Sequence, residues 1–492
     1  MRASLLNLDY LLPEWIVCGT ILVLILSYLL GTTDRRRLAD LSVLGLVTAL
    51  FFSVVTFFEP AVVGRVSIGN GLLQVDPFSQ LFKILFLVST LAAVLYSAGS
   101  VEIHGKRWME FNCFLLGVTS GMMFLASSMN LMMVYLSFEM MSLSSYVLAG
   151  YTRGDPRSTE AGYKYVLFGA VSSGVMLFGL SLMYGLLGTL DMGLMAQRTA
   201  LAQFPDLHLL LLPLTLVFVG LGYKIAFFPF HYWAPDVYEG SPTPVTAFFS
   251  VGTKAAGLAL LLRLLLGTLS LDQTQAIPWA GDLLAFLAAM TMTVGNLAAL
   301  NQANIKRMLA YSAIAHAGYM LMGVAVLNVA GAEAVLFYLF AYMFTNLGAF
   351  TVVVALFNLY QSEQVDELTG MGKLFPLASV CMAICLFSLT GLPPTAGFIG
   401  KFYVFAAVIQ KGYFVLALVG AINTAISLFY YMRIMKAFYF REPKAEMLAA
   451  GPMPCGYNVL IASLTVPVLI FGICWSRLYE YCSTSISSLI AH

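Results

Sequence analysis

Four ionisable residues lie inside long apolar stretches of the sequence: Glu139, Lys224, Lys254 and Lys401. On membrane-insertion scales a charge at mid-bilayer costs about 2.5–3.5 kcal/mol, so four would cost on the order of 10–14 kcal/mol. Residues kept at that cost usually face an internal cavity and mark a path for ions or protons. Desolvation disfavours a charged lysine, and a nearby carboxylate favours it. A lysine beside a movable glutamate could therefore hold or release a proton.

Each of these residues also has a structural interpretation. Glu139 and Lys224 could form a static buried ion pair. Lys254 could extend its ammonium group towards the headgroups, and Lys401 could reach the surface beyond a helix break.

Five further residues within the apolar stretches are open to both kinds of interpretation. Lys164 and Arg263 lie nearer the ends of their stretches, where extension of the side chain to the headgroups is a real alternative, and at Lys83 that alternative is favoured. His316 could belong to a proton path or be a hydrogen-bonded core histidine. His231 follows Pro229 and could be a gate or an ordinary loop residue.

The composition points to a membrane protein without redox centres of its own. Hydrophobic residues make up 60% of the chain and charged residues only 10%, whereas soluble domains carry about 25% charged residues. The seven cysteines form no C-x-x-C pair, so we expect no disulfide framework, zinc site or iron–sulfur cluster. No Gly-rich phosphate loop is present, and a net charge of +1 argues against nucleic acid as a partner.

These residues must be positioned by membrane-spanning helices, which need roughly 20 apolar residues each. The sequence predicts an all-α membrane protein with about fourteen such helices and no sizeable soluble domain. The first apolar run lacks a cleavage site for a signal peptide and is interpreted as helix 1. The predicted spans are 15–31, 39–58, 78–98, 111–128, 130–150, 163–188, 208–230, 242–267, 279–299, 305–328, 331–357, 374–394 running on to 410, 413–438 and 457–476.

Two predicted helices are interrupted. Helix 7 runs through Lys224 into Pro229 and Pro235, and helix 12 contains the sequence GLPPTAG before Lys401. Such breaks are tolerated at membrane depth only where protein or a water-filled cavity satisfies the freed backbone groups. Interrupted helices at matching positions of two halves indicate a transport site. We therefore expect two inverted five-helix repeats.

The repeats divide the chain into four parts. These are residues 1–110 with helices 1–3, residues 111–267 with helices 4–8, residues 268–440 with helices 9–13, and residues 441–492 with helix 14.

The lysine and arginine residues of the loops predict the orientation. Fourteen of them lie in the odd-numbered links and five on the opposite face. The odd-numbered links should therefore face the cytoplasm and both termini the outside. Such a topology fits a multi-pass protein of the bacterial inner membrane.

Three stretches carry a resemblance to a known family: FPFHYWAPDVYEGSPTPVTAF (228–248), NIKRMLAYSAIAHAGYMLMG (304–323) and LTGLPPTAGFIGKFYVF (389–405). The chain resembles the antiporter-like, proton-pumping subunits of respiratory complex I, the NADH–quinone oxidoreductase, and most of all those of the N type. The resemblance implies a proton-translocating subunit that carries no redox centre. NADH, FMN, iron–sulfur clusters and quinone would act elsewhere in the complex, and the partners would be its other membrane and peripheral subunits, lipid and protons.

The resemblance also implies roles for individual residues. Glu139 matches the glutamate of helix 5 and Lys224 the lysine of helix 7 that pairs with it. Lys254 matches the central lysine of helix 8, and Lys401 the lysine of helix 12 that hands protons on. Lys164 and His231 match further functional positions.

Three alternatives remain at this point. The chain could belong to a multisubunit cation/proton antiporter or to a membrane-bound hydrogenase, whose folds and ionisable residues would be the same. It could also be a structural membrane scaffold whose buried charges have lost their function.

Overall fold

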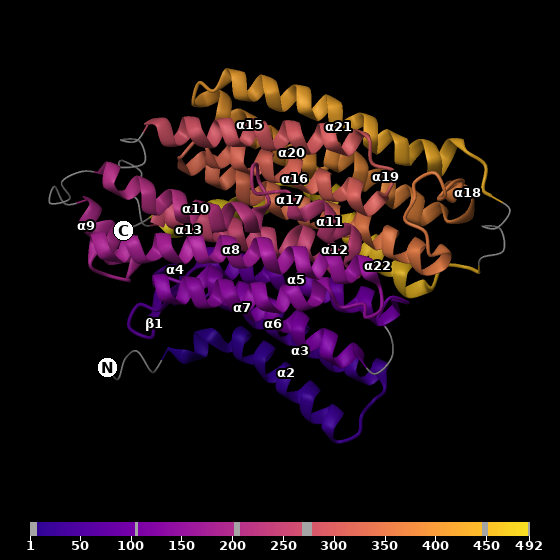
Figure 1. Cartoon of the computed structure of the whole chain (residues 1–492), viewed down its shortest axis with the longest axis horizontal. Coiled ribbons are helices and arrows are strands. Elements are labelled where there is room, and N and C mark those ends of the chain that lie inside the picture. Colours follow the sequence, from indigo (N-terminus) through magenta and orange to yellow (C-terminus); the bar gives the residue numbers. More distant parts are fainter. Residues whose placement is uncertain (1–6, 104–106, 201–206, 268–277, 445–450, 491–492) are drawn as a thin grey trace.

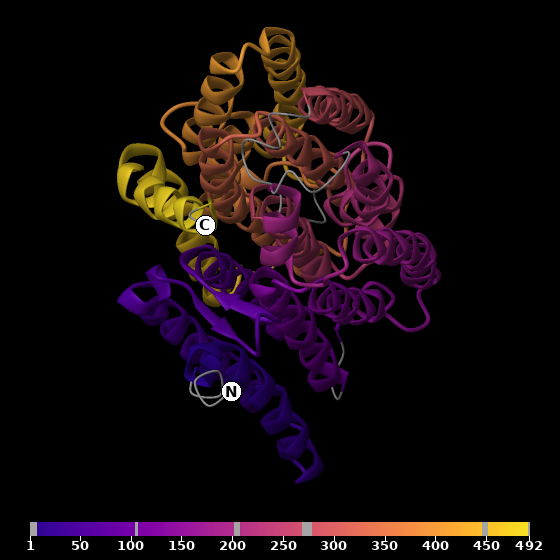
Figure 2. The same ribbon diagram turned by 90° about the vertical axis from the view of Figure 1, so that its left-hand side faces the viewer.

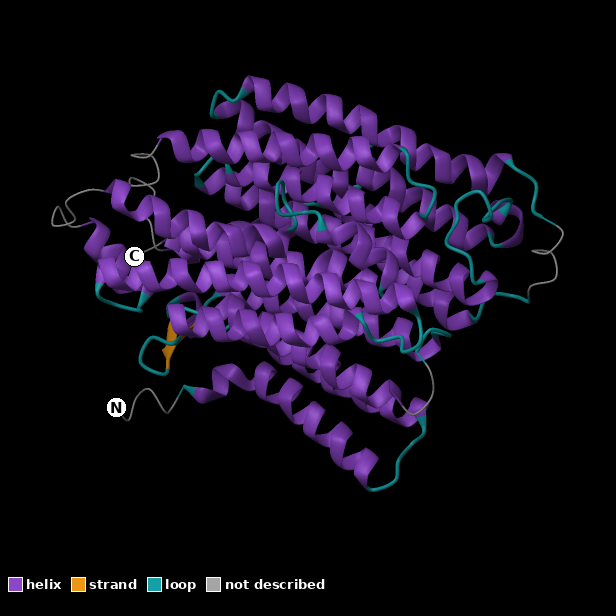
Figure 3. Ribbon diagram, viewed as in Figure 1, coloured by secondary structure: helices purple, strands orange, loops and turns teal. Residues whose placement is uncertain are grey.

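The protein, described here by a computed structural model, is almost entirely helical (Figure 3). The structure describes residues 7–103, 107–200, 207–267, 278–444 and 451–490. Arg2 and Lys106, which contribute to the predicted orientation, lie outside the described residues. The long helices run roughly along one direction (Figure 1).

The N-terminal part contains three long helices and a small hairpin. Its elements are η1 (Leu8–Leu11), α2 (Leu12–Leu29), α3 (Arg35–Phe57), α4 (Pro60–Val63), β1 (Val66–Ile68), β2 (Leu73–Val75) and α5 (Pro77–Gly99). The antiparallel strands pair Val66 with Val75. Gly69, Asn70 and Gly71 all have positive φ in the connecting turn, which suits these residue types.

The next part of the chain begins the functional bundle. Its elements are α6 (Trp108–Ser127), α7 (Leu131–Ala149), α8 (Pro156–Leu187), α9 (Met192–Ala200), η3 (Leu207–Leu210), α10 (Leu211–Ile225), α11 (Trp233–Gly240), α12 (Thr243–Phe248), the π-helical turn η4 (Phe249–Thr253) and α13 (Lys254–Gly267).

The remaining elements complete the bundle. They are α15 (Pro278–Leu300), α16 (Ile305–Val324), α17 (Val329–Tyr360), α18 (Met371–Leu374), α19 (Pro376–Thr390), α20 (Ala396–Gln410), α21 (Phe414–Phe440), α22 (Cys455–Ile473) and α23 (Ser476–Ile490).

Polar caps set the beginnings of several long helices. The side chains of Asp76, Asn130, Asp155, Asn304 and Asn328 each accept a hydrogen bond from a backbone N–H in the first turn of the following helix. These N–H groups have no partner within their own helix, so the caps stabilise the helix starts in apolar surroundings.

The prediction of an all-α membrane protein is confirmed. Among the described residues, eleven helices are long and apolar enough to cross a membrane. Three shorter apolar helices, α10, α19 and α20, are the pieces of the two interrupted segments. The total of fourteen spans, the four-part division of the chain and the inverted repeats stay predictions. The interrupted helix comes after α6, α7 and α8 in the first series and after α15, α16 and α17 in the second.

Some elements differ from the prediction. The part after residue 441 holds two helices, α22 and α23, instead of one. The predicted span 208–230 ends early, at Ile225, and the second half of the segment is α11. Neither α9 nor the β1–β2 hairpin was expected, because both are short or too polar to give an apolar window.

Burial separates the centre of the bundle from its edges. The segment from α12 through α13 and most of α17 are buried inside the protein, whereas only 33% of the apolar windows of α2, α3 and α22 is buried. Figure 2, viewed along the helices, shows α2 and α3 as an extension at one edge and α21 at the opposite edge. Exposed side chains such as Trp15 and Phe51 suit contact with lipid.

Candidate functional site

Both interrupted segments place a lysine at the C-terminal end of a half-helix. Helix α10 ends after Lys224, where Ala226 adopts a left-handed conformation with φ of 62°. Helix α19 ends at Thr390, and Gly391 follows with φ of 90°. The ammonium group of Lys401 donates to the Thr390 carbonyl oxygen at 3.0 Å. The last carbonyls of a helix lack partners and carry partial negative charge, so a cation is favoured at both positions.

Lys224 is completely buried and has hydroxyl partners, not a carboxylate. Its Nζ donates to Ser142 Oγ at 3.1 Å and to the Tyr165 hydroxyl at 3.5 Å. No ion pair of Lys224 is found among the described residues. Glu139, one turn before Ser142 on α7, acts on Lys224 electrostatically without touching it. The Oε1 atom of Glu139 is buried and has no hydrogen-bond partner in the described part of the chain.

Lys254 follows the π-helical turn η4 in the middle of the bundle. Its side chain is 3% exposed, and its Nζ has no hydrogen-bond partner among the described residues. The ammonium group lies over the ring of Tyr238, 5.6 Å from the centroid. Single π turns within α-helices are frequent at functional sites.

Three aromatic rings connect the surroundings of Lys224 and Lys254. The Nζ of Lys224 lies 5.5 Å from the centroid of Tyr165. The Tyr165 ring stacks on Trp233 at 4.5 Å, and Trp233 meets the Tyr238 ring edge to face at 6.1 Å. The two lysines are therefore joined by a continuous wall of side chains from α8 and α11.

His316 interacts electrostatically with both Lys254 and Lys401. Its Nδ1 is 2.5 Å from the Tyr338 hydroxyl and its Nε2 is 3.2 Å from the Tyr431 hydroxyl. Both ring nitrogens are thus engaged by groups that can donate or accept. Lys401 lies 4.3 Å from the centroid of Tyr319, whose ring is 5.9 Å from that of His316.

Two predicted site residues lie outside the series formed by Lys224, Lys254, His316 and Lys401, which we call the axis. Lys164 is one third exposed and pairs with Glu160 at 2.7 Å and with Asp236 of α11 at 2.5 Å. His231 lies in the break between α10 and α11, where it stacks on Tyr232 at 4.4 Å, and its Nδ1 has no partner among the described residues.

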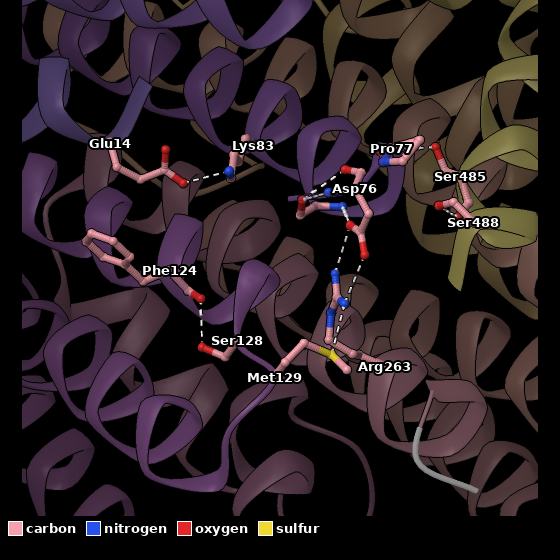
Figure 4. A network of polar contacts seen from close by, with 11 residues as sticks. Glu14, Asp76, Pro77, Lys83, Phe124, Ser128, Met129, Arg263, Ser485 and Ser488 are labelled. Atoms are coloured by element: carbon pink, nitrogen blue, oxygen red, sulfur yellow. Dashed lines mark hydrogen bonds and ion pairs between the residues drawn. The ribbon is translucent and has the colours of Figure 1, made fainter. Parts of the chain in front are cut away.

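The expectation that Lys83 extends to the headgroups is wrong. Lys83 is fully buried, and its Nζ lies 2.6 Å from Glu14 Oε1 (Figure 4). Arg263 is buried as well and binds both carboxylate oxygens of Asp76, at 3.0 and 3.1 Å. Because a buried carboxylate compensates the positive charge of each side chain, neither has to extend to water. Lys254 and Lys401 are also buried, at 3% and 5% exposure, so neither reaches the surface.

Sequence reasoning did not identify several residues of the site. The tyrosines that contact the buried lysines and His316, namely Tyr165, Tyr238, Tyr338 and Tyr431, are amphipathic and resemble ordinary core residues. Glu14 and Asp76 were overlooked as partners because each lies next to the end of a predicted span, where charges are common. A capping pattern, Asp76-Pro77 with Ser79, was the available signal for Asp76.

The site as a whole can carry charge across the bundle through ionisable and hydroxyl groups. Glu139 and Lys224 form its first electrostatically coupled group, and Lys254, His316 and Lys401 form its second. Among the described residues no group of three or more His, Cys, Asp or Glu could hold a metal ion.

Comparisons with known proteins give a consistent picture. A sequence model of the family described as "NADH:quinone oxidoreductase/Mrp antiporter, TM" matches residues 128–427. NADH-quinone oxidoreductase subunit N of Anaeromyxobacter sp. (strain Fw109-5) is 42% identical over 85% of each chain. Subunit N 2 of Sorangium cellulosum (strain So ce56) is 41% identical over 98% of each chain.

Solved structures agree with these sequence matches. A chain of respiratory complex I from Thermus thermophilus, solved with bound aureothin, superimposes with a TM-score of 0.79 at 32% identity, covering 95% of this chain and 98% of that one. A chain of the Mrp complex from Dietzia sp. DQ12-45-1b gives a TM-score of 0.87 at 21% identity, covering 98% of each chain, and shows the shared fold alone. The chain therefore belongs to the NADH:quinone oxidoreductase/Mrp antiporter transmembrane family, in the branch that contains subunit N of NADH-quinone oxidoreductase.

Proposed function

We propose that the chain is a proton-translocating membrane subunit of NADH–quinone oxidoreductase. Its relatives are named as subunit N of that enzyme, at 41–42% identity over most of their length. Electron transfer from NADH to quinone, with FMN and iron–sulfur clusters, takes place in other subunits. This chain supplies a proton path through the inner membrane, with both of its termini on the outer side.

The observation that carries the proposal is the state of three buried lysines. Lys224, Lys254 and Lys401 are at most 5% exposed, and among the described residues none has a carboxylate within ion-pairing distance. A charge in such surroundings is costly, and a lysine lowers that cost by releasing its proton. Three such groups along one path suit proton transfer better than they suit structural stability.

The proposed cycle begins at Glu139 and Lys224. When Glu139 lies close, its negative charge holds the proton on Lys224. When redox events in the complex move or screen that charge, the proton leaves Lys224 for Lys254, assisted by water. It then passes by way of His316 to Lys401 and leaves towards the outer face. Lys224 and Lys254 are reloaded from the cytoplasmic side.

The contacts of Lys224 support the first step. Its ammonium group is bonded to Ser142 and Tyr165 while Glu139 is not in contact. Neutral hydroxyl partners hold a proton less firmly than a carboxylate does, because they offer no opposite charge. The arrangement therefore corresponds to the open form of the pair.

The test replaces Lys224 or Glu139 by alanine in the assembled, purified enzyme. Both variants should still oxidise NADH but should pump far fewer protons per NADH oxidised. Proton pumping is measured in proteoliposomes with a pH-sensitive dye. Lys436→Ala, which removes an exposed lysine of α21, is the matched control and should pump normally. Unchanged pumping in the Lys224 and Glu139 variants at normal subunit levels would end the proposal.

A second candidate function is that of a subunit of a multisubunit cation/proton antiporter. This candidate is supported by the fold that the chain shares with a chain of the Dietzia Mrp complex. The two candidates differ in their partners: complex I supplies subunits that carry flavin and iron–sulfur clusters, and an Mrp-type assembly does not. Mass spectrometry and the absorption spectrum of the complex purified through this chain will distinguish them.

A further inference from the structure

A polar cavity of about 370 Å³ opens among the helix ends and loops at one end of the bundle. Its charged lining includes Glu102, Asp155, Arg157, Glu239, Lys306 and Glu363. Lys306 and Arg157 belong to the face that the lysine and arginine pattern predicts to be cytoplasmic. Four of these six side chains are carboxylates and two are cationic, so the opening favours cations. It also has room for ordered water.

Glu102 lies in the wall of this cavity, in the loop that follows α5. Its Oε2 accepts a hydrogen bond from the backbone N–H of Thr243 at 2.8 Å. Thr243 is the first residue of the continuous helical segment Thr243–Gly267 that contains Lys254. Glu102 therefore joins the cavity to the start of the helix that carries the central lysine.

The surroundings of Glu102 favour proton binding. Burial is the largest influence on the pKa of the Glu102 carboxyl and raises it above its ordinary value. The charge of Lys306 and the hydrogen bond from Thr243 lower this pKa, and the charge of Glu363 raises it. The net shift is upward. Tyr457 of α22 also faces this carboxyl. The carboxyl thus binds a proton more readily than an ordinary surface glutamate does.

A row of hydroxyl residues lies along the helical segment between Thr243, which contacts Glu102, and Lys254; Thr246 donates to the Tyr238 carbonyl oxygen and Ser250 to the Ala247 carbonyl oxygen. Thr243, Thr246, Ser250 and Lys254 are spaced three, four and four residues apart, so they follow one face of the helical segment. All four are buried, and the Oγ1 of Thr243 and the Nζ of Lys254 lack hydrogen-bond partners among the described residues. Buried polar atoms without protein partners mark positions for ordered water.

The start of the row is held in place by a buried cation. The Nζ of Lys306 donates to the Ser241 carbonyl oxygen at 2.8 Å and pairs with Glu363 at 2.8 Å. Because Lys306 belongs to α16, this contact ties the beginning of α12 to the second half of the bundle. The geometry around Glu102 is thereby fixed by elements that are far apart in the sequence.

We propose that this cavity is the proton-loading site of the subunit and that Glu102 passes protons from it along the Thr243, Thr246 and Ser250 row to Lys254. The inference rests on the proposed function, since it names the uptake side of the same path. The Glu102 carboxylate takes a proton from a hydronium ion in the cavity. It releases the proton to a water beside Thr243, and the cavity then protonates the carboxylate again.

The test is Glu102→Gln in the assembled enzyme, with pumped protons per NADH measured at several values of the cytoplasmic-side pH. The variant should lose pumping progressively as that pH rises, because uptake limits the cycle when protons are scarce. Glu102→Asp should restore part of the loss. Glu442→Gln, which changes an exposed carboxyl that is not among the residues lining this cavity, is the matched control and should behave as the unmodified protein.

A second variant keeps the inference testable if Glu102→Gln fails to assemble. Thr246→Val removes a hydroxyl from the row without changing charge and should give the same pH-dependent loss, while Thr246→Ser should not. Lys254→Met, measured in parallel, separates the two proposals. If Lys254→Met abolishes pumping and the Glu102 and Thr246 variants pump normally at every pH, the loading site is wrong and the relay stands. If Lys254→Met also pumps normally, the proposed function itself fails.

Discussion

Two regions of the protein bury basic side chains in an apolar bundle. In one region each basic side chain contacts a carboxylate, and in the other it does not. Beside the N-terminal helices, Lys83 pairs with Glu14 at 2.6 Å and Arg263 with Asp76 at 3.0 Å. Along the axis of interrupted helices, Lys254 has no hydrogen-bond partner among the described residues and lies over an aromatic ring.

The difference concerns how firmly each proton is held. A buried cation with a touching carboxylate stays charged, because losing the proton would strand the negative partner in a medium of low dielectric. A buried lysine with only hydroxyl, carbonyl and aromatic contacts has no such constraint. Under the proposed function, the paired charges stabilise the bundle and the unpaired lysines exchange protons.

The largest difference between the regions should appear when lysine is exchanged for arginine. Arginine keeps the charge but does not release a proton in proteins. Lys254→Arg should therefore abolish most proton pumping while the subunit still assembles. Lys83→Arg should leave pumping per NADH near normal, since Glu14 needs only a cation. Equal pumping in the two variants would remove the distinction between the regions.

The next largest effect should be on stability, at the Glu14–Lys83 pair. Lys83→Met alone leaves a buried carboxylate without its partner and should lower the free energy of unfolding by about 3–5 kcal/mol. Adding Glu14→Gln should recover most of that loss, because the stranded charge is gone. Thermal unfolding of the purified complex, with subunit levels in the membrane, measures both. A double variant as unstable as the single one would contradict this interpretation.

A smaller loss is expected from Arg263→Lys. The guanidinium group of Arg263 binds both oxygens of Asp76, and lysine keeps the charge but reaches only one of them. The variant should lose about 1.5–3 kcal/mol, the value of one hydrogen bond to a charged group. The same unfolding measurement decides this. No loss in Arg263→Lys would show that the two-point contact is unimportant, and a loss as large as that of Arg263→Leu would show that the charge alone contributes nothing.

The smallest effect should follow from breaking an exposed ion pair. Lys373 lies 2.7 Å from Glu442, but their side chains are 64% and 81% exposed. Lys373→Ala should therefore change the free energy of unfolding by less than about 1 kcal/mol. A loss comparable to that of Lys83→Met would show that burial does not govern the energetics of these pairs.

The sequence predicted the lysines of the axis because a charge inside an apolar run is visible without a structure. It predicted the two interruptions as well, because Pro229, Pro393 and Pro394 disfavour a continuous helix. The carboxylate partners Glu14 and Asp76 could not be recognised, since pairing across helices depends on how the helices pack. The electrostatic interaction of His316 with two lysines depends on packing in the same way.

The helices overlooked in the sequence share a physical cause. Helix α23 has polar residues along one side and packs its apolar side on α5 and α17. A search for continuous apolar windows does not detect such an amphipathic helix. Its residues Tyr479 and Ser483 both donate to Glu333 of α17, at 2.8 and 2.7 Å. These contacts explain how a helix of modest hydrophobicity is held against the bundle.

One measurement tests the central claim most directly: the number of protons pumped per NADH in two variants that each remove one buried lysine. Lys254→Met removes an unpaired lysine, and the double variant Glu14→Gln with Lys83→Met removes a paired one. We expect the first to lose most of its pumping and the second to pump like the unmodified enzyme at equal subunit levels. Normal pumping by Lys254→Met, or an equal loss in both, would contradict the claim that unpaired lysines carry the protons.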